Sequence, residues 1–425
     1  MIKKPFFGII KPKIEYERLG TVSSPREIPV PRQLTFFVEA PYERTDSLRV
    51  LAGQEVQENE KLLPYDNEEA YLIAAAGGKV ADVFSHTGNF GEKFTGISIA
   101  VDEKAGRDEA FAAAAQTPSL ENAASFLRFI PGGLPASLLA EDGRVKTIVV
   151  SGVDEDLLTM TRQYVIKNEM GDVRRGIDLI KKIFEGRKIV LAVPDNMVAE
   201  ARAAGVEVEA VDLSYPAANP RMIAAKIAGQ PIPAGTSCEE AGIFFISAEA
   251  VAAVARAYDA RRVPQQKVIT VISKDGERSL VSALIGTPVG DVLGACSQEV
   301  REGDRIVFGG PMKGTAVYTE AYPVRPDTDA IMVQDAGDIP GVSDRACVNC
   351  GECVRVCPAR MPVNVLVRYL EAGEYTEAVD RCDLQSCIEC GLCAFVCPAR
   401  IPVFQYIKLG KYEFARLNAA EAENA

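Results

Sequence analysis

The chain has 425 residues, which is too long for one ordinary domain and predicts roughly two to four. Its formal net charge of -12 argues against a nucleic-acid-binding surface, because such a surface would need a basic face. A composition of 48% hydrophobic and 25% charged residues is typical of soluble globular protein with several buried cores.

The amino-terminal part of the chain predicts a β-rich module. Its first 17 residues contain only six consecutive uncharged residues between lysines, which is too short for the apolar core of a signal peptide, so export is not expected. Residues 45–100 contain short β-rich runs that are separated by Gly and Asn turn residues. Short strands at close spacing predict a small all-β unit.

From residue 146 the pattern changes to apolar runs that alternate with helical segments. This alternation predicts βαβ units and a parallel, Rossmann-like sheet. The expected strands and helices are 146–153, 172–186, 187–195, 196–205 and 206–214.

Residues 241–258 form the most apolar long stretch of the chain. The stretch carries Glu249 and Arg256 and falls short of the roughly 20 apolar residues that a membrane-spanning helix needs. We therefore interpret it as a strand followed by a helix, and we expect any membrane association to be peripheral and to depend on partner subunits.

Residues 267–298 predict a β-hairpin with a turn at 274–277, followed by an amphipathic helix. The segment 304–314, "DRIVFGGPMKG", closes this unit. Together they indicate a small α+β domain.

The cysteine pattern near the carboxyl end predicts two iron-sulfur clusters. The motif C-x2-C-x2-C-x3-C-P occurs twice, and in bacterial ferredoxins the fourth cysteine of each such motif ligates the other cluster. Gly351 and Gly391 would let backbone amides approach the sulfides. The first [4Fe-4S] cluster is assigned to Cys347, Cys350, Cys353 and Cys397, and the second to Cys387, Cys390, Cys393 and Cys357.

The alternative for these cysteines is a pair of structural zinc sites, although zinc sites more often use two C-x2-C pairs with a spacer. Disulfides are not expected in this spacing without an export signal. Cys238 and Cys296 stand alone and are expected to be small buried side chains, and Cys382 is a weak candidate for a further ligand. His86, the only histidine, lies in a turn-like segment and predicts no histidine-based catalysis.

Several motifs resemble the RnfC subunit of the Rnf ion-translocating electron transport complex. They are "LRVLAGQEVQENEKL" with "AAAGGKVADV", "GTPVGDVL" with "GDRIVFGGPMKG", and "CIECGLCAFVCPARIP". The resemblance implies a multidomain α/β fold. Its expected parts are an N-terminal β-rich barrel-sandwich module (1–115), a Rossmann-like α/β domain of the complex I flavoprotein type (120–260), an SLBB-type, ubiquitin-like α+β domain (265–330) and a C-terminal helical di-[4Fe-4S] ferredoxin domain (335–415).

In that family the Rossmann-like domain binds FMN and NADH through a glycine-rich segment and an acidic phrase. Here the corresponding segment, 129–143, keeps Gly132 and Gly133 but not the dense glycine pattern, and the acidic phrase is Asp154, Glu155 and Asp156. One interpretation is a remodelled flavin or nucleotide pocket. The other is a Pro-Gly turn followed by an acidic helix start, where carboxylates favour the helix dipole without any ligand. The loss of glycines favours an FMN-free protein without NADH dehydrogenase activity of its own.

The function implied by the resemblance is that of an electron-transfer subunit of an Rnf-type complex. It would relay electrons through two [4Fe-4S] clusters between partner subunits and an external carrier, which could be ferredoxin, NAD(H) or a cytochrome, at the cytoplasmic face of the plasma membrane. One alternative is an FMN- and NADH-dependent subunit of a soluble cytosolic reductase. Another is an adaptor whose clusters only hold the fold.

Overall fold

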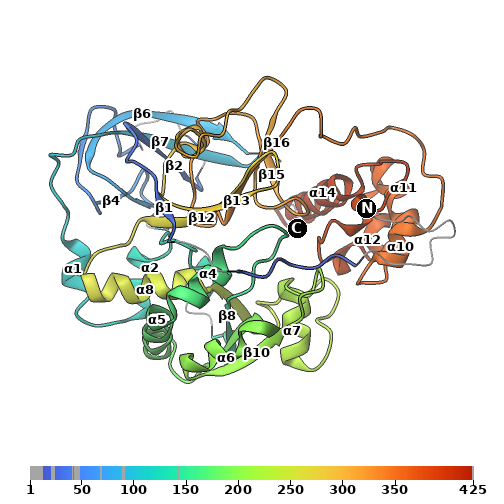
Figure 1. The fold of residues 1–425 in the computed structure, drawn as a ribbon, viewed down its shortest axis with the longest axis horizontal. Helices are drawn as coiled ribbons and strands as arrows, with labels where there is room; N and C mark the ends of the chain where they lie inside the picture. Colours follow the sequence, from blue (N-terminus) through green and yellow to red (C-terminus); the bar gives the residue numbers. More distant parts are fainter. Residues whose placement is uncertain are drawn as a thin grey trace.

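The computed structural model describes residues 13–20, 24–40, 42, 48–67, 69–88, 91–140 and 143–423. The apolar run that was considered for export precedes residue 13 and lies outside these ranges. Figure 1 shows sheets and their helices on one side of the molecule and the helices of the carboxyl-terminal region on the other. None of the helices in the described ranges is both long and apolar enough to cross a membrane.

The predicted parallel sheet is confirmed. Its strand order is β10-β9-β8-β11, and every neighbouring pair is parallel. Apolar residues of β8 and β9 are fully buried because helices cover the sheet. The strands are β8 (Thr147–Ser151), β9 (Lys188–Pro194), β10 (Glu207–Val211) and β11 (Ile243–Ser247).

The apolar stretch 241–258 forms β11 and then α8 (Ala248–Ala260), as predicted. Helix α8 packs so closely on α5 (Met170–Ile183) that a Cβ atom on Gly176 would lie 2.0 Å from the Val251 carbonyl oxygen. Its apolar residues are therefore explained by burial between helices and sheet. The other helices of this region are α4 (Thr161–Asn168), η1 (Asp195–Met197), α6 (Val198–Ala201), η2 (Arg202–Ala204) and α7 (Pro220–Ala228).

A second sheet of six strands has the order β1-β13-β12-β16-β14-β15. Strands β12 and β13 form the predicted antiparallel hairpin, and α9 (Val289–Ala295) follows it. Strand β1, from the amino-terminal region, pairs with β13 in parallel, which no local pattern could predict. The strands are β1 (Arg26–Glu27), β12 (Gln266–Ile272), β13 (Arg278–Leu284), β14 (Arg305–Phe308), β15 (Thr315–Val317) and β16 (Ala330–Gln334).

The amino-terminal β unit contains a four-stranded sheet of order β2-β7-β6-β3 and a separate pair, β4 and β5. The prediction that His86 lies in a turn is wrong, because it belongs to β6, where it is buried and stacks on Phe37 at 4.0 Å. The strands are β2 (Gln33–Val38), β3 (Glu55–Val56), β4 (Lys61–Leu62), β5 (Leu72–Ile73), β6 (Gly78–Thr87) and β7 (Lys93–Val101).

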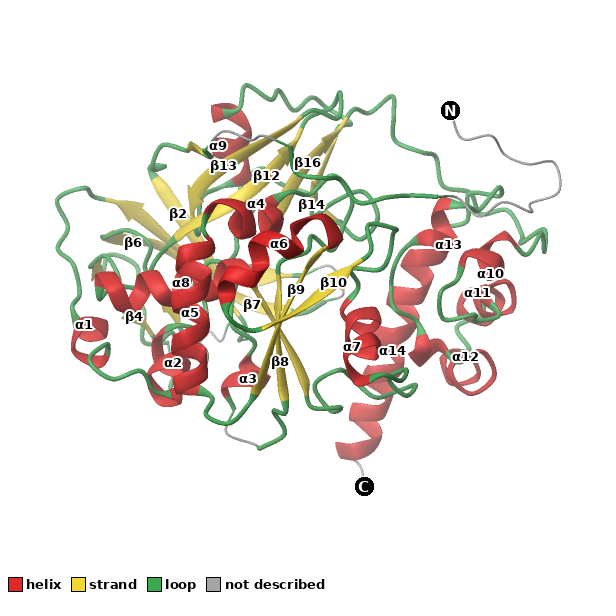
Figure 2. Ribbon diagram, turned by 60° about the horizontal axis from the view of Figure 1, so that its bottom comes forward, coloured by secondary structure: helices red, strands yellow, loops and turns green. Residues whose placement is uncertain are grey.

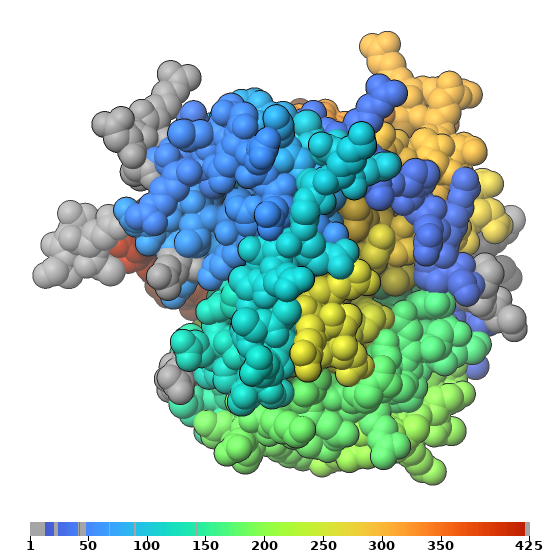
Figure 3. All heavy atoms as spheres, turned by 90° about the vertical axis from the view of Figure 1, so that its left-hand side faces the viewer, coloured from blue at the N-terminus to red at the C-terminus, as the bar shows by residue number. Residues whose placement is uncertain are grey.

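Short helices connect this β unit to the parallel sheet. They are α1 (Ala110–Ala114), α2 (Leu120–Phe126) and α3 (Ala136–Leu139). Figure 3 shows the β unit, these helices and the α/β region as one continuous surface.

The carboxyl-terminal region is helical and has its own apolar core, which includes the buried Cys382. Cys238 and Cys296 are half-buried in other parts of the chain. The helices are α10 (Glu352–Val356), α11 (Val363–Glu371), α12 (Tyr375–Cys382), η3 (Leu384–Ser386), α13 (Leu392–Phe395) and α14 (Val403–Glu423).

Candidate functional site

The two cysteine motifs fold in the same way. In each, a glycine with positive φ precedes a short helix: Gly351 (74°) precedes α10, and Gly391 (73°) precedes α13. The same turn geometry follows at Arg360 (φ 57°) and Arg400 (φ 55°). Each motif therefore wraps its cysteines around a loop and one helical turn.

The first predicted thiol set surrounds one cavity. Three cysteines of the first motif line it together with Cys397 of the second motif. Cys350 is solvent-exposed, so this cavity lies at the surface. The structure thus brings together Cys347, Cys350, Cys353 and Cys397.

The second predicted set also converges. Burial raises the pKa of the Cys393 thiol, and the neighbouring thiols of Cys387, Cys390 and Cys357 raise it further. Cys390 and Cys393 are buried, unlike Cys350. Both fourth cysteines therefore lie near the opposite motif, as the crossed assignment requires.

Donor chemistry in both sets fits iron-sulfur ligation. Each set offers four thiols, and the amide of Glu389 donates to Sγ of Cys387 at 3.4 Å, a contact that stabilises thiolate ligands. Within the described ranges, no three His, Cys, Asp or Glu side chains are placed to hold a single metal ion.

The second thiol set is anchored to the body of the protein. The Tyr215 hydroxyl donates to the Cys390 carbonyl at 2.6 Å, and the Asn219 amide donates to the Ile388 carbonyl at 2.8 Å. Both side chains come from the segment that leads into α7, and Figure 2 shows α7 beside α14 of the helical region. The second set therefore faces the α/β region, and the first set faces away from it.

The "GGPMKG" loop, residues 309–314, packs against the second motif. A Cβ atom on Gly391 would lie 2.5 Å from the Met312 carbonyl oxygen, whereas one on Gly351 would find only Arg355 at 3.9 Å. Only the second motif therefore needs glycine for a close backbone contact as well as for its φ angle.

We expect Gly391→Ala to destabilise the second cluster site much more than Gly351→Ala destabilises the first. Each substitution puts a non-glycine residue in the left-handed region, which costs roughly 1–2 kcal/mol, but only Gly391→Ala also forces the backbone apart. The measurement is iron content per chain together with the thermal unfolding midpoint. Equal losses in the two variants would contradict the packing argument.

The three carboxylates of the acidic phrase point in three directions. Asp154 accepts the amides of Arg162 (2.9 Å) and Gln163 (3.3 Å) in the first turn of α4, as the helix-start interpretation predicts. Asp156 accepts the amides of Met312 (3.0 Å) and Lys313 (2.7 Å) and so holds the "GGPMKG" loop.

Glu155 is paired with two cations. Its carboxylate contacts Arg162 at 2.8 Å and Lys313 at 2.9 Å. Burial by itself would raise the pKa of Glu155, but the two cations outweigh it and lower the pKa to about 2. Glu155 therefore links the α/β region to the loop that supports the second thiol set.

The Glu155 ion pair should stabilise the fold at neutral pH and lose this effect in acid. A lowered folded-state pKa contributes stability that is present above the ordinary Glu pKa of about 4.3 and is lost as the pH falls toward 2. We expect Glu155→Gln to lower the unfolding midpoint at pH 7 and to approach the wild type at pH 3.5. The exposed Glu299→Gln should show little difference at either pH. A constant Glu155→Gln difference across this range would contradict the assignment.

The glycine segment lines a cavity, but its amides already have partners. The amide of Gly132 donates to Pro326 (2.8 Å), that of Gly133 to Ile130 (2.8 Å) and that of Leu134 to Arg128 (2.9 Å), all through carbonyl oxygens. Free amides are what a phosphate-binding loop presents to its ligand. These residues therefore do not fit the phosphate cradle of a flavin mononucleotide.

Two adjoining cavities lie at this place, of about 380 Å³ and about 550 Å³. Glu155 and Arg162 line both, while Gly132 and Gly133 line only the smaller one. Asp156 lines the larger cavity, and the buried Asp154 lines neither. The structure thus brings four of the five predicted residues to one region but does not bring them to a common ligand position.

Sequence reasoning missed the cations of this region. Arg162 joins Glu155 to Asp329, and Asp329 joins the buried Lys267. A lysine at the start of the apolar run "KVITVI" was the one available signal, because an unpaired charge is not found in such a strand.

Family models match two parts of the chain. Residues 346–401 match the 4Fe-4S dicluster domain, and residues 134–236 match the NqrA second alpha/beta domain. The protein is thus a multidomain α/β protein with a carboxyl-terminal iron-sulfur dicluster domain.

Known proteins with related sequences agree with the resemblance. The chain is 27% identical to the RnfC-type subunit of the proton-translocating ferredoxin:NAD(+) oxidoreductase complex of Clostridium ljungdahlii, over 96% of this chain and 94% of that protein. It is 28% identical to the RnfC-type subunit of the ion-translocating oxidoreductase complex of Pseudomonas aeruginosa, over 51% and 29%, and 25% identical to that of Rhodobacter capsulatus, over 54% and 46%. The chain is a homologue of RnfC, as its motifs predicted.

The matches differ in extent. The aligned part is less than half of the P. aeruginosa and R. capsulatus proteins, but nearly all of the C. ljungdahlii protein. Among solved structures, an NAD+-reducing [NiFe]-hydrogenase aligns over 71% of this chain and 64% of its own, with 14% identity and a TM-score of 0.47.

Proposed function

We propose that this chain is an electron-transfer subunit of an Rnf-type oxidoreductase complex and relays electrons through two [4Fe-4S] clusters. The observation that carries the proposal is the crossed arrangement of two sets of four thiols, one at the surface and one against the α/β region. Cys347, Cys350, Cys353 and Cys397 would hold the first cluster, and Cys387, Cys390, Cys393 and Cys357 the second. Bound clusters supply reversible one-electron chemistry.

The residues of the chain support this role in separate ways. The thiols would bind the irons, Tyr215 and Asn219 position the loop of the second motif, and the "GGPMKG" loop shields that motif from water on one side. Shielding and amide contacts to sulfur set the potential of such clusters. The partners would be other subunits of the complex, with ferredoxin, NAD(H) or a cytochrome as the external carrier, at the cytoplasmic face of the membrane.

We also propose that the chain performs this relay without FMN. Engaged amides in the glycine segment support this, as does the ion pair of Glu155 and Arg162 between the two cavities. The second candidate is an FMN- and NADH-dependent reductase subunit, which the presence of cavities next to the second thiol set favours.

The finer division of the chain is part of the same proposal. A barrel-sandwich module (1–115), a Rossmann-like domain (120–260), an SLBB-type domain (265–330) and a ferredoxin domain (335–415) are consistent with the sheets described above. A hairpin, a helix and the strand β16 parallel to β12 support the ubiquitin-like character of the third unit.

Anaerobic purification with iron, sulfide and flavin assays on one sample tests both candidates. We expect about eight irons per chain, no flavin, bleaching by dithionite and none by NADH, because two cubanes hold four irons each. About one FMN per chain with rapid bleaching by NADH would favour the reductase instead. A sample that binds zinc and no iron would overturn the relay.

A further inference from the structure

The first cluster site has an edge that is open to solvent. Cys350 is exposed, and Val348, which lines the same cavity, is 66% exposed. The corresponding Cys390 of the second site is buried against the body of the protein. A protein that exchanges electrons with this chain can therefore approach the first site and not the second.

Apolar side chains are concentrated at this edge. Val342, Val348 and Val365 are 76%, 66% and 39% exposed, and all lie in segments that build or flank the first site. Exposed valines in one place, with polar residues around them, are typical of a protein-binding surface.

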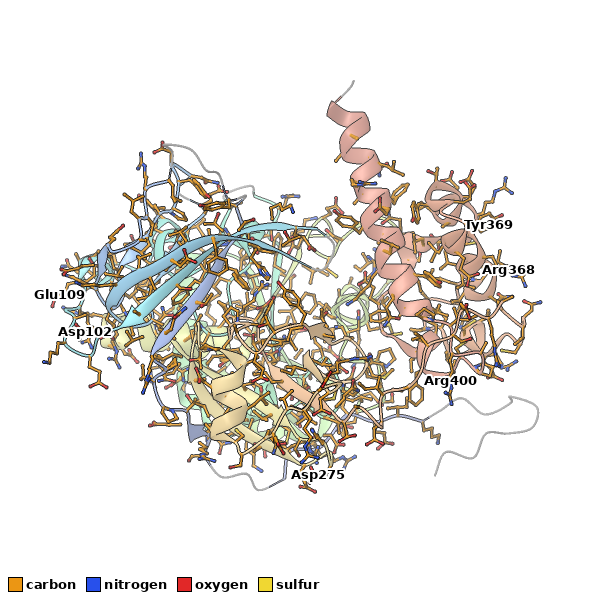
Figure 4. All side chains as sticks on the ribbon, turned by 90° about the horizontal axis from the view of Figure 1, so that it is seen from above. Asp102, Glu109, Asp275, Arg368, Tyr369 and Arg400 are labelled. Atoms are coloured by element: carbon orange, nitrogen blue, oxygen red, sulfur yellow. The ribbon has the colours of Figure 1, made fainter. Side chains whose placement is uncertain are left out.

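Arginines surround the apolar patch. Segments 343–355, 363–368 and 397–403, which form the first site, contain four arginines and two carboxylates, a local balance of 4 − 2 = +2, while the whole chain carries -12. All four are exposed, and Figure 4 shows Arg368 and Arg400 at the outer side of the helical region. They are Arg345, Arg355, Arg368 and Arg400.

Three of these cations are free to meet a partner. Among the described residues only Arg355 has an ionic partner, Glu352, and Arg345, Arg368 and Arg400 have none. Backbone contacts hold the rim in place: the Ser343 amide donates to the Arg400 carbonyl at 3.0 Å, and the Arg345 amide donates to the Ser343 hydroxyl at 3.1 Å. The rim is thus a fixed positive region on an acidic molecule.

We propose that this surface, named here the arginine edge (Val342, Arg345, Val348, Val365, Arg368 and Arg400), docks an acidic one-electron carrier protein. The proposal rests on the relay function above. Positive charge around the exposed site steers an acidic partner and turns away a basic one, and the valines form the small apolar contact that a transient redox encounter uses. In the encounter the reduced partner loses one electron and the oxidised first cluster gains it, with no bond formed or broken, and the reverse transfer uses the same contact.

The test is stopped-flow reduction of the oxidised, cluster-loaded full-length chain by two probes, an acidic bacterial ferredoxin and a basic cytochrome c of reduced low-potential type. We expect the ferredoxin to react faster, with a rate constant that falls as salt is added. Arg345→Glu/Arg400→Glu should slow it at least tenfold at low salt, and the difference should vanish at high salt. The milder Arg345→Gln/Arg400→Gln should give a smaller effect in the same direction.

The matched control is Arg187→Glu/Arg202→Glu, which reverses two exposed charges in the α/β region. It should react like the wild type. Equal slowing of both double variants, no slowing of either, or a faster reaction with the basic cytochrome would overturn the docking surface. Iron content and dithionite bleaching are recorded for every variant, so that failure of the relay itself, seen as a wild-type chain without reducible iron, is distinguished from failure of the docking.

Discussion

Cys397→Ser is expected to remove the first cluster, although Cys397 belongs to the second motif. The iron content should fall from about eight to about four per chain, because each cubane holds four irons. Cys397 lines the cavity of the first thiol set, whereas Cys357 acts on the pKa of Cys393 in the second. Cys357→Ser should therefore remove the second cluster instead.

Double variants distinguish crossed from uncrossed ligation. Cys347→Ser/Cys397→Ser should retain about four irons, since both residues serve one cluster, and Cys347→Ser/Cys357→Ser should retain almost none. Cys382→Ser is the matched control, because this cysteine is buried in the same helical core but lies outside both sets. The opposite outcome in the two double variants would show that each motif holds its own cluster.

Lys267→Met is expected to destabilise the protein by about 3–5 kcal/mol, because it leaves buried carboxylates without their cation. The Lys267 side chain is 0% exposed and pairs with Glu249, which is 1% exposed, and with Asp329 at 3.0 Å. Burial by itself would lower the pKa of Lys267, but the two carboxylates raise it, so the lysine is charged. Urea unfolding measured at one fixed salt concentration gives the loss.

Two comparisons sharpen this prediction. Lys188→Ala breaks an exposed pair with Glu207 and should cost no more than about 1 kcal/mol. Lys267→Met/Glu249→Leu should be less harmful than Lys267→Met alone, because it removes both charges of the buried pair. A Lys267→Met protein as stable as Lys188→Ala would show that the network contributes little.

Local patterns predicted the elements because their information is local. The alternation of apolar runs and helices located the parallel sheet, and the apolar stretch with Glu249 and Arg256 was correctly interpreted as strand and helix. His86 was placed wrongly because the turn residues after it were extended backward over the end of β6. Strand β1 was not predicted, since its partner β13 lies about 250 residues away and two residues carry no periodicity.

The candidate nucleotide site shows where such reasoning ends. Gly132, Asp154, Glu155 and Asp156 were found from motif correspondence, but their partners lie in distant segments: Pro326, Arg162, Lys313 and Met312. Whether an amide is free to meet a phosphate depends on those partners. No spacing within residues 129–156 contains that information.

The amino-acid sequence by itself determined the two cysteine motifs, their cofactor class and the crossed assignment, because ligand type and spacing are properties of a short segment. Only the tertiary structure distinguished the two motifs from each other. Gly391 contacts Met312 and Cys390 is held by Tyr215, whereas Gly351 and Cys350 face open space. Nearly identical segments thus acquire a buried and an exposed environment, because burial is decided by which distant residues pack against them.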